Sequence, residues 1–556
     1  MYEGDFFMYG SVNINNLTKE NTYTIWYNGK IYNTKELKYQ GNNEIELILR
    51  LYLNYGIEMI QHLNGVFSFG ILDTKKEEVF LVRDHFGVKP LYYSILNDSL
   101  IFGSDIKSIL EFPNFKTQID SQGINELFGI GPAHTPGTCV FKNIYELKPA
   151  HFAIYNKSGF KISRYWKLES KQHTDDFDNT CNKVKTLLSD SIKQQLISDK
   201  PICTFLSGGL DSSIITTYAS EYCKEKGIDL NTFSVDYIDN DKNFVKNDFQ
   251  PNSDKYYIDV MTNKLNTNHH TIFLDTPELA DSLEDAMIAR DLPGMADVDS
   301  SLLLFCKKVK KEIGIALSGE CADEIFGGYP WFFREDSLNS KTFPWSIALE
   351  ERQKLLYPDI SKKINLKEYV DYRYNESLNE VEILDIDSDE TAQKRKISYL
   401  TLNWFMQTLL DRTDRMAMYS GLEVRVPFCD YKLVEYVWNI PWEMKAYKGR
   451  EKGLLRYIME DLIPEEIVYR KKSPYPKTHN PNYLTKVKDV LKNIINNKNS
   501  PINNVLNRGY LLEILNTDGK SFTRPWFGQL MTGPQLMAYL IQVNQWFEKY
   551  NPEIII

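Results

Sequence analysis

The chain has 556 residues, seven cysteines and a formal net charge of −10. At roughly 100–200 residues per domain this length predicts several compact units, and the lack of a basic stripe argues against nucleic acid as the main partner. No cysteine pair has CxxC spacing, which is typical of a protein from the reducing cytoplasm. No apolar run approaches the ~20 residues of a membrane span, so we expect a cytoplasmic protein with no membrane partner.

Residues 1–166 are dense in β-type runs and turns, which predicts an α+β domain with much antiparallel sheet. Residues 22–27 run into Asn28-Gly29, a pair that predicts the turn of a β-hairpin. Residues 44–55 carry an apolar face at helical spacing. Further strands are expected at 65–72, 78–82, 91–95 and 99–103, with a turn at Asn97-Asp98 between the last two.

Residues 167–176 are polar and aperiodic, which predicts a linker to a second domain over 177–556. After a helix at 177–196, an apolar run at 202–205 predicts a buried strand, and residues 214–222 have helical spacing. Between them lies a glycine turn. Glycines let the backbone approach a ligand closely, and free N–H groups at a helix N-terminus attract phosphate, so this order predicts an anion cradle. The cradle comprises Leu206, Ser207, Gly208, Gly209, Leu210, Asp211, Ser212 and Ser213.

Strands and helices continue to alternate after the cradle, which predicts a parallel, doubly wound sheet that binds a nucleotide at the carboxyl ends of its strands. A second loop at 318–329 follows another strand, so both loops fall at that edge. Asp211, Glu320 and Asp323 are hard oxygen ligands of the kind Mg²⁺ prefers, although Glu-x-x-Asp spacing also occurs on many exposed helices. The expected elements are 232–236, 256–265, 269–274, 278–290 and 313–317, followed from residue 360 by mainly helical segments that include 399–414, 433–438 and 453–462.

Both loops have sequences that resemble known motifs. SGGLDSS at 207–213 resembles the pyrophosphate loop of the ATP-pyrophosphatase group, and SGECADEIFGGYPWF at 318–332 resembles the signature of asparagine synthetases. Further stretches similar to that family are DLPGMADVDSS at 291–301, DRTDRMAM at 411–418, LEVRVPF at 422–428, EKGLLR at 451–456 and RKKSPYPKTH at 470–479. The resemblance implies an α/β doubly wound domain of the ATP-pyrophosphatase (adenine nucleotide α-hydrolase-like) type with a helical C-terminal part.

The resemblance also implies roles for individual residues. Asp211 and Asp323 would hold Mg²⁺ and pyrophosphate, with Glu320 near the reacting carboxylate and Lys452 against the α-phosphate. The basic stretch 470–479 would cover the phosphates. For the substrate, Asp297 lies in the stretch near the acyl-adenylate, and one of Arg412, Arg415 and Arg425 would clamp an amino-acid carboxylate. ATP would contact the cradle residues together with Val235, Ser318 and Gly319.

In the first domain, YNGKIYN at 27–33, LNGVFSF at 63–69 and RDHFGVKPLYY at 83–93 resemble the Ntn-hydrolase-like glutaminase domain of the same family. That domain uses a cysteine directly after the initiator Met as nucleophile, whereas position 2 here is Tyr2 and the first cysteine is Cys139. Its Arg-Gly-Pro-Asp segment is missing too. Remnants of the glutamine site are Asn28, Gly29 and Glu44, but Lys30 replaces the family's Glu and the stretch before Glu44 is shortened. We expect a truncated glutaminase without activity. A start codon assigned too far downstream is the alternative, and the internal shortening argues against it.

The implied reaction joins ATP, aspartate and ammonia. The aspartate side chain would attack the α-phosphorus to give β-aspartyl-AMP and pyrophosphate, and ammonia, rather than glutamine, would supply the nitrogen. Two alternatives remain: an ATP-dependent amide ligase or cyclase on another carboxylate, of the β-lactam synthetase or lasso-peptide cyclase type, and a non-catalytic homologue. The sequence leaves open whether the chain forms a homodimer or works with a separate glutaminase.

Overall fold

The computed structural model describes residues 8–13, 22–41, 43–243, 253–476, 478 and 480–556, which form two compact units. The first unit comprises the chain up to Gly123, then His134–Glu169 and Pro552–Ile555, and the second comprises Ile124–Ala133, Ser170–Asn551 and Ile556. Tyr2, on which part of the glutaminase prediction depends, lies outside the described residues. In the described part of the chain, none of the helices is long and apolar enough to cross a membrane.

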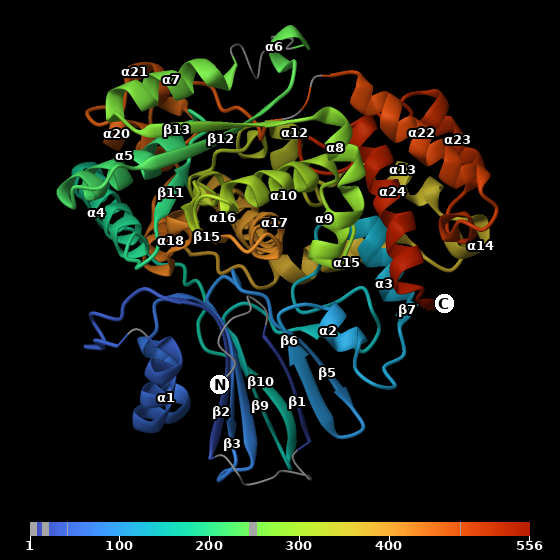
Figure 1. The fold of residues 1–556 in the computed structure, drawn as a ribbon, viewed down its shortest axis with the longest axis horizontal. Coiled ribbons are helices and arrows are strands. Elements are labelled where there is room, and N and C mark those ends of the chain that lie inside the picture. Colours follow the sequence, from blue (N-terminus) through green and yellow to red (C-terminus); the bar gives the residue numbers. More distant parts are fainter. Residues whose placement is uncertain (1–7, 14–21, 42, 244–252, 477, 479) are drawn as a thin grey trace. The chain divides into compact units, whose positions relative to one another are not determined.

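The first unit contains two larger antiparallel sheets with strand orders β1-β6-β5-β8 and β10-β9-β4-β3-β2, and a parallel pair of β7 and β16 (Figure 1). Large apolar side chains of β3 and β4, such as Phe67, Phe69 and Phe80, are fully buried against the helix α1. The elements are β1 (Tyr9–Asn13), β2 (Tyr23–Ile31), α1 (Glu44–Tyr55), η2 (Gly56–His62), β3 (Gly65–Asp73), β4 (Glu78–Arg83), β5 (Tyr92–Leu96), β6 (Ser99–Gly103), α2 (Lys107–Leu110), β7 (Gln118–Asp120), β8 (Tyr145–Glu146), β9 (His151–Asn156), β10 (Gly159–Arg164) and β16 (Glu553–Ile555); α3 (Ser121–Asn125) crosses the boundary between the units.

The predicted hairpin at Asn28-Gly29 is wrong. The strand β2 runs through both residues, and Asn28 pairs with Ser68 while Gly29 pairs with Phe67. A Cβ atom at Gly29 would lie 2.3 Å from the Val66 carbonyl oxygen, so the glycine permits close strand pairing and does not make a turn. Pairing with distant residues has overridden the local turn preference. The predicted turn at Asn97-Asp98 is confirmed, with φ of 49° and 57° between β5 and β6.

The second unit is built on a parallel sheet with the order β13-β12-β11-β14-β15, as the alternating pattern predicted (Figure 1). Its strands are β11 (Ile202–Phe205), β12 (Asn231–Tyr237), β13 (Asn268–Leu274), β14 (Ile315–Leu317) and β15 (Glu423–Arg425). The sequence pattern did not predict β15, because a strand of three residues has too little periodicity and forms by pairing with β14. The order reverses next to β11, so the carboxyl ends of β11 and β14 lie at a topological switch point.

Helices cover both faces of this sheet. The helices α9, α10 and α17 bury apolar side chains such as Leu303, Val309 and Met416 against one face, while α4 and α5 pack together on the other (Figure 1). The helices up to residue 326 are η3 (Glu126–Ile130), α4 (Phe177–Gln195), α5 (Leu210–Glu225), α6 (Asn240–Asn243), α7 (Asp254–Leu265), α8 (Thr276–Asp281), α9 (Leu283–Arg290), α10 (Asp297–Lys310) and α11 (Ala322–Phe326). The single helix predicted at 278–290 is divided into α8 and α9, which meet at Ser282.

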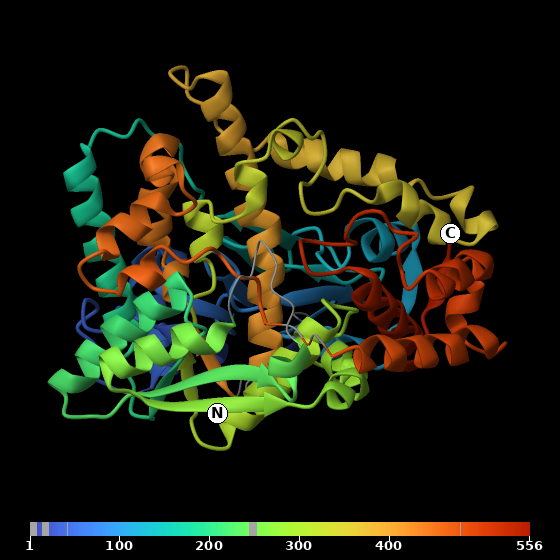
Figure 2. The same cartoon turned by 90° about the horizontal axis from the view of Figure 1, so that it is seen from above.

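The rest of the unit is mainly helical. Figure 2 shows the longest of these segments, in which α16, the π-helical turn η5 and α17 follow one another without a break. The elements are η4 (Pro330–Phe332), α12 (Glu335–Leu338), α13 (Leu349–Leu355), α14 (Pro358–Ser361), α15 (Leu366–Leu378), α16 (Asp389–Leu400), η5 (Thr401–Phe405), α17 (Met406–Tyr419), η6 (Pro427–Cys429), α18 (Tyr431–Asn439), α19 (Trp442–Lys445), η7 (Tyr447–Gly449), α20 (Gly453–Met459), α21 (Glu465–Val468), α22 (Asn482–Asn496), η8 (Pro501–Asn504), α23 (Arg508–Asn516) and α24 (Gly533–Tyr550).

Candidate active site

The glycine cradle lies between the end of β11 and the start of α5, at the switch point of the parallel sheet. Gly208 has φ of +67°, and a Cβ atom there would lie 2.6 Å from the Cβ of Tyr257. Only glycine has room for this backbone. The loop is held by Ser212, whose hydroxyl accepts from the Ser207 N–H at 3.2 Å and lies 3.0 Å from the Ser207 hydroxyl. The first N–H groups of α5 therefore face a preformed cradle of the kind that binds phosphate.

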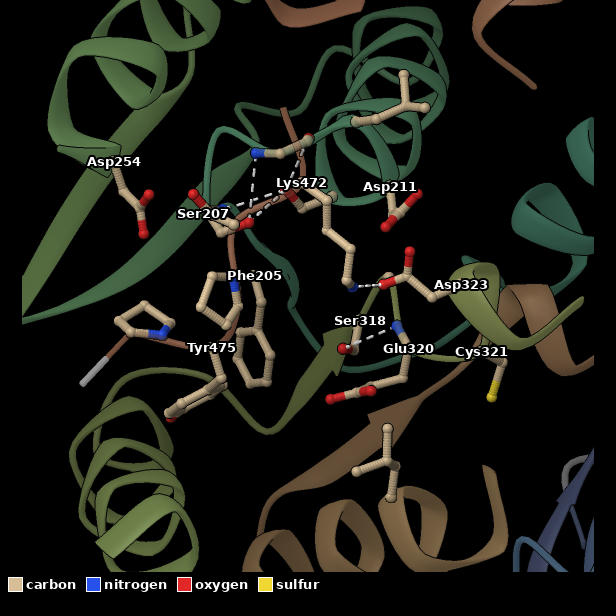
Figure 3. Close-up of a pocket in the computed structure, with 18 of the residues that line it drawn as sticks. Phe205, Ser207, Asp211, Asp254, Ser318, Glu320, Cys321, Asp323, Lys472 and Tyr475 are labelled. Carbon is tan, nitrogen blue, oxygen red and sulfur yellow. Dashed lines mark hydrogen bonds and ion pairs between the residues drawn. The ribbon is translucent and has the colours of Figure 1, made fainter. Parts of the chain in front are cut away.

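The second loop follows β14 and packs directly on the first. The Ser318 N–H donates to the Arg425 carbonyl oxygen at 2.9 Å, which extends the pairing of β14 with β15. A Cβ atom at Gly319 would lie 2.9 Å from the Ser212 nitrogen, so this position needs a glycine for the two loops to meet. Cys321 has φ of +77°, which turns the chain sharply into α11. The turn brings Glu320 and Asp323 to the same cavity as Asp211 (Figure 3).

A cavity of about 270 Å³ lies over the two loops. Apolar and backbone groups beside Leu206 and Val235 line one part of it, and charged side chains line another. The predicted site residues that line the cavity are Leu206, Ser207, Gly209, Leu210, Asp211, Ser212, Val235, Ser318, Gly319, Glu320, Asp323, Arg412 and Lys452. Gly208, Ser213, Asp297, Arg415 and Arg425 are not among the lining residues.

Lys452 is the centre of the charged part. Its Nζ lies 2.8 and 2.7 Å from the two carboxylate oxygens of Asp211 and 2.7 Å from Oδ1 of Asp323. Burial alone would lower the pKa of Lys452, but the two carboxylates raise it, so the lysine stays charged. Burial acts to raise the pKa of Asp323, and the lysines beside it outweigh that effect and hold the pKa below its usual range. For Asp211, burial dominates and the pKa is raised.

The three candidate arginines have different surroundings. Arg412 donates to Oε1 of Glu320 at 2.7 Å, inside the cavity. Arg415 is fully buried and donates to Asp411 at 3.3 Å. Arg425 donates to the Gln195 carbonyl oxygen and to Glu423 at 2.7 Å, which ties β15 to the end of α4. Of the three, Arg412 alone lines the cavity. Asp297 accepts from the Gln535 amide at 3.1 Å.

Further contacts at the cavity involve residues without an individual prediction. Arg470 bonds to Asp254 and donates to the Ser207 carbonyl oxygen at 3.2 Å. Lys472 bonds to the carboxylate of Asp323 (Figure 3). No local signal could have found Asp254, because its partner lies 216 residues away. Lys477 and His479 of the same basic stretch lie outside the described residues.

Glu324 also lines the cavity without an individual prediction, and its carboxyl group accepts from the Tyr329 hydroxyl at 2.6 Å. Burial, and then the charge of Asp323, raise the pKa of Glu324 to about 8. Its place directly after Asp323 in the signature segment was the available signal.

The carboxylates of Asp211 and Asp323 suit an Mg²⁺ ion that is bound together with phosphate. In the described ranges no three His, Cys, Asp or Glu side chains converge as a self-sufficient metal site. Asp211 and Asp323 supply two converging carboxylates beside the glycine cradle. Mg²⁺ commonly binds through one or two carboxylates plus substrate phosphates, so the residues present fit that ion together with a nucleotide.

In the first unit, two of the residues predicted as remnants of a glutamine site, Asn28 and Glu44, have protein partners. The amide of Asn28 donates to the Ser104 hydroxyl at 3.3 Å. The carboxylate of Glu44 lies 2.7 Å from Nζ of Lys30 and accepts from the Tyr27 hydroxyl at 2.5 Å. A carboxylate that could hold the ammonium group of an amino acid is thus paired with an ammonium group of the chain itself.

Comparisons with known proteins match two parts of the chain. A family model described as "Asparagine synthase" matches residues 183–548, and one described as "Glutamine amidotransferase domain" matches residues 15–166. The asparagine synthetase [glutamine-hydrolyzing] 3 of Bacillus subtilis is 49% identical over 546 residues, covering 96% of this chain and 89% of the relative. The asparagine synthetase [glutamine-hydrolyzing] 1 of the same organism is 27% identical, covering 89% and 82%. The rat enzyme asparagine synthetase [glutamine-hydrolyzing] is 28% identical, covering 81% and 71%.

Proposed function

Because this chain belongs to the asparagine synthase family of ATP-dependent amide ligases, we propose that it makes asparagine from aspartate and ATP with ammonia as the nitrogen donor. The observation that carries the first half of this proposal is the Asp211–Lys452–Asp323 cluster over the glycine cradle. The cluster and the cradle together provide an anion site, two carboxylates for Mg²⁺ and a lysine held in the charged form. Such a set serves the transfer of an adenylyl group with pyrophosphate as the leaving group.

In the first step, a side-chain carboxylate oxygen of aspartate attacks the α-phosphorus of ATP, and the bond to the β-phosphate oxygen breaks. The N–H groups of the cradle and Lys452 hold the phosphates and offset the negative charge that develops on them. Bound Mg²⁺ would neutralise the pyrophosphate as it forms, held by Asp211 and Asp323. The products of this step are β-aspartyl-AMP and pyrophosphate.

In the second step, the nitrogen of ammonia attacks the activated acyl carbon, loses a proton and displaces AMP. Glu320 would lie near this carbon and is oriented by Arg412, which donates to it at 2.7 Å. Because Arg412 is the candidate arginine that lines the cavity, we assign the α-carboxylate clamp to it. A fork of N–H donors suits a planar carboxylate.

The choice of ammonia over glutamine rests on the first unit. The resemblance to the glutaminase domain implies that a carboxylate, here Glu44, binds the ammonium group of glutamine. In this chain Nζ of Lys30 lies 2.7 Å from Oε1 of Glu44 and takes that place. We therefore propose that the domain predicted at residues 1–166 acts as a scaffold without glutaminase activity.

The test is a product assay on the purified full chain with ATP, Mg²⁺, aspartate and either ¹⁵N-ammonium or amide-labelled ¹⁵N-glutamine. We expect labelled asparagine, AMP and pyrophosphate with ammonium and no labelled asparagine with glutamine. Equal labelling from glutamine would refute the choice of donor. Pyrophosphate release with a different carboxylate but not with aspartate would favour the other amide ligases.

A matched pair of variants ties the activity to the cavity. Asp211→Asn removes a carboxylate from the cluster, and Asp229→Asn removes an exposed carboxylate that does not line the cavity. We expect pyrophosphate release to be lost in the first variant and retained in the second. Retention in both would contradict the assigned site.

A further inference from the structure

Asp323 is paired with two lysines, one on each carboxylate oxygen. Nζ of Lys452 lies 2.7 Å from Oδ1, and Lys472 bonds to Oδ2. Figure 3 shows the Lys472 side chain reaching across the cavity to the Asp323 carboxylate, with Asp211 nearby. Two ammonium groups thus neutralise the two carboxylates that the proposed function assigns to Mg²⁺.

The two lysines differ in the exposure of their side chains and in the number of carboxylate oxygens that they contact. The side chain of Lys452 is 3% exposed and also bonds both oxygens of Asp211. Its backbone is left-handed with φ of 51°, at the start of α20. The side chain of Lys472 is 19% exposed, and the residues around it, 471–474, belong to no helix or strand. Its ammonium also lies 4.6 Å from the centre of the Tyr329 ring. Lys472 is therefore the lysine that a cation can displace with less disruption.

Displacing Lys472 from Asp323 costs more free energy when the cation binds alone than when it binds together with a polyphosphate. A free divalent cation at Asp323 would repel Lys472 and give it no new partner, and an unpaired ammonium group in a partly buried site is unfavourable. A polyphosphate beside the cradle would supply anionic oxygens to Lys472 as the cation takes Asp323. The cavity joins the cradle, Asp323 and Lys472 in one space, so this exchange needs no other part of the chain.

We propose that Lys472 is an internal counter-ion that keeps a free divalent cation away from Asp323 and yields to it when a nucleoside triphosphate or pyrophosphate binds. The proposal rests on the proposed function in that it takes Asp323 as a ligand of the nucleotide's cation. Its consequence is a positive coupling between metal and polyphosphate binding. Such coupling is reciprocal, so each ligand increases the affinity for the other by the same factor.

The test measures binding without turnover. Free Mn²⁺, an EPR-visible replacement for Mg²⁺, is titrated into the wild-type chain and into Lys472→Met and Lys472→Arg, each without nucleotide. We expect Lys472→Met to bind Mn²⁺ about tenfold more tightly than wild type, within the usual range of coupling between two ligands. Lys472→Arg keeps the positive charge and should stay near the wild-type affinity. Adding Asp323→Asn to Lys472→Met should abolish the gain, which assigns the bound ion to this carboxylate.

An unchanged or weaker Mn²⁺ affinity in Lys472→Met would overturn the proposal, and so would an equal gain in Lys472→Arg. Pyrophosphate should raise the Mn²⁺ affinity of the wild type more than that of Lys472→Met, and an equal increase in both would also count against it. These results do not depend on catalysis. If the Mn²⁺ results are as expected but aspartate and ammonium give no asparagine, the proposed reaction fails and the role of Lys472 stands.

Discussion

Replacing Lys452 with methionine should destabilise the second unit, because the lysine is the shared cation of two buried carboxylates. The substitution keeps the apolar stem and removes an ammonium group that lies within 2.8 Å of three carboxylate oxygens. Asp323 retains Lys472, but Asp211 loses the lysine that contacts both its oxygens. Removing one partner of a buried ion pair typically costs about 3–5 kcal/mol, and we expect a loss in this range.

The assay is equilibrium unfolding in urea at pH 8 with EDTA, followed by tryptophan fluorescence. Because a chain with two compact units can unfold in more than one transition, the transition of the second unit is fitted by itself. The double variant Lys452→Met/Asp211→Asn removes the stranded charge together with its partner and should recover at least half of the loss. A loss below about 1 kcal/mol, the size of an exposed ion pair, would refute the reasoning, as would a double variant no more stable than the single one.

The effect of Lys452→Met on the free energy of unfolding should depend on pH, and the direction of that dependence follows from two pKa shifts. The pKa of Asp323 is lowered in the folded wild type, so its stabilising contribution is present above the unfolded pKa near ~3.9 and is lost as the pH falls through the folded value. In Lys452→Met, the stranded Asp211 carries a raised pKa from burial, so its penalty is present above that pKa and disappears on protonation. The difference in the free energy of unfolding between wild type and variant should therefore shrink as the pH falls from 8 through the raised pKa of Asp211.

Four further substitutions test other parts of the second unit. Arg352→Met should lower the free energy of unfolding by about 3 kcal/mol in urea titrations, because the fully buried guanidinium bonds the Phe128, Gly129 and Gly131 carbonyl oxygens, which would each lose this donor; a change within error would contradict this role. Gly208→Ala should weaken ATP binding about tenfold in calorimetry, since its methyl group would meet Tyr257 at 2.6 Å and strain a left-handed backbone, and an unchanged affinity would show that the cradle tolerates the shift. Arg412→Lys should raise the KM for aspartate in pyrophosphate release, whereas Arg425→Lys should mainly lower stability because Arg425 bonds the end of α4; the reverse pattern would exchange their roles.

Local sequence was sufficient for much of the second unit. The alternation of short apolar runs with helical spacing predicted a parallel sheet, and the chain order of strand, glycine loop and helix placed both loops at the same edge of it. The glycine turn at 208–209 could be predicted as an anion cradle because it stands between an apolar strand run and a run with helical spacing. These features depend on neighbours in the chain, so they can be deduced from the chain alone.

Other features depend on partners that no local pattern specifies. The strand β2 continues through Asn28-Gly29 because β3 pairs along its full length, and β15 exists because β14 offers it a free edge. The sequence did not distinguish between three arginines as the group that binds the substrate carboxylate. In the folded chain, Arg412 is the one of the three that lines the cavity.

The bonds of Lys472 to Asp323 and of Arg470 to Asp254 join residues 149 and 216 positions apart. The sequence by itself determined which residue types stand at the ends of the strands. Only the folded chain decided which charges meet there, because the strength of a charge pair depends on distance and burial in space and not on separation along the chain.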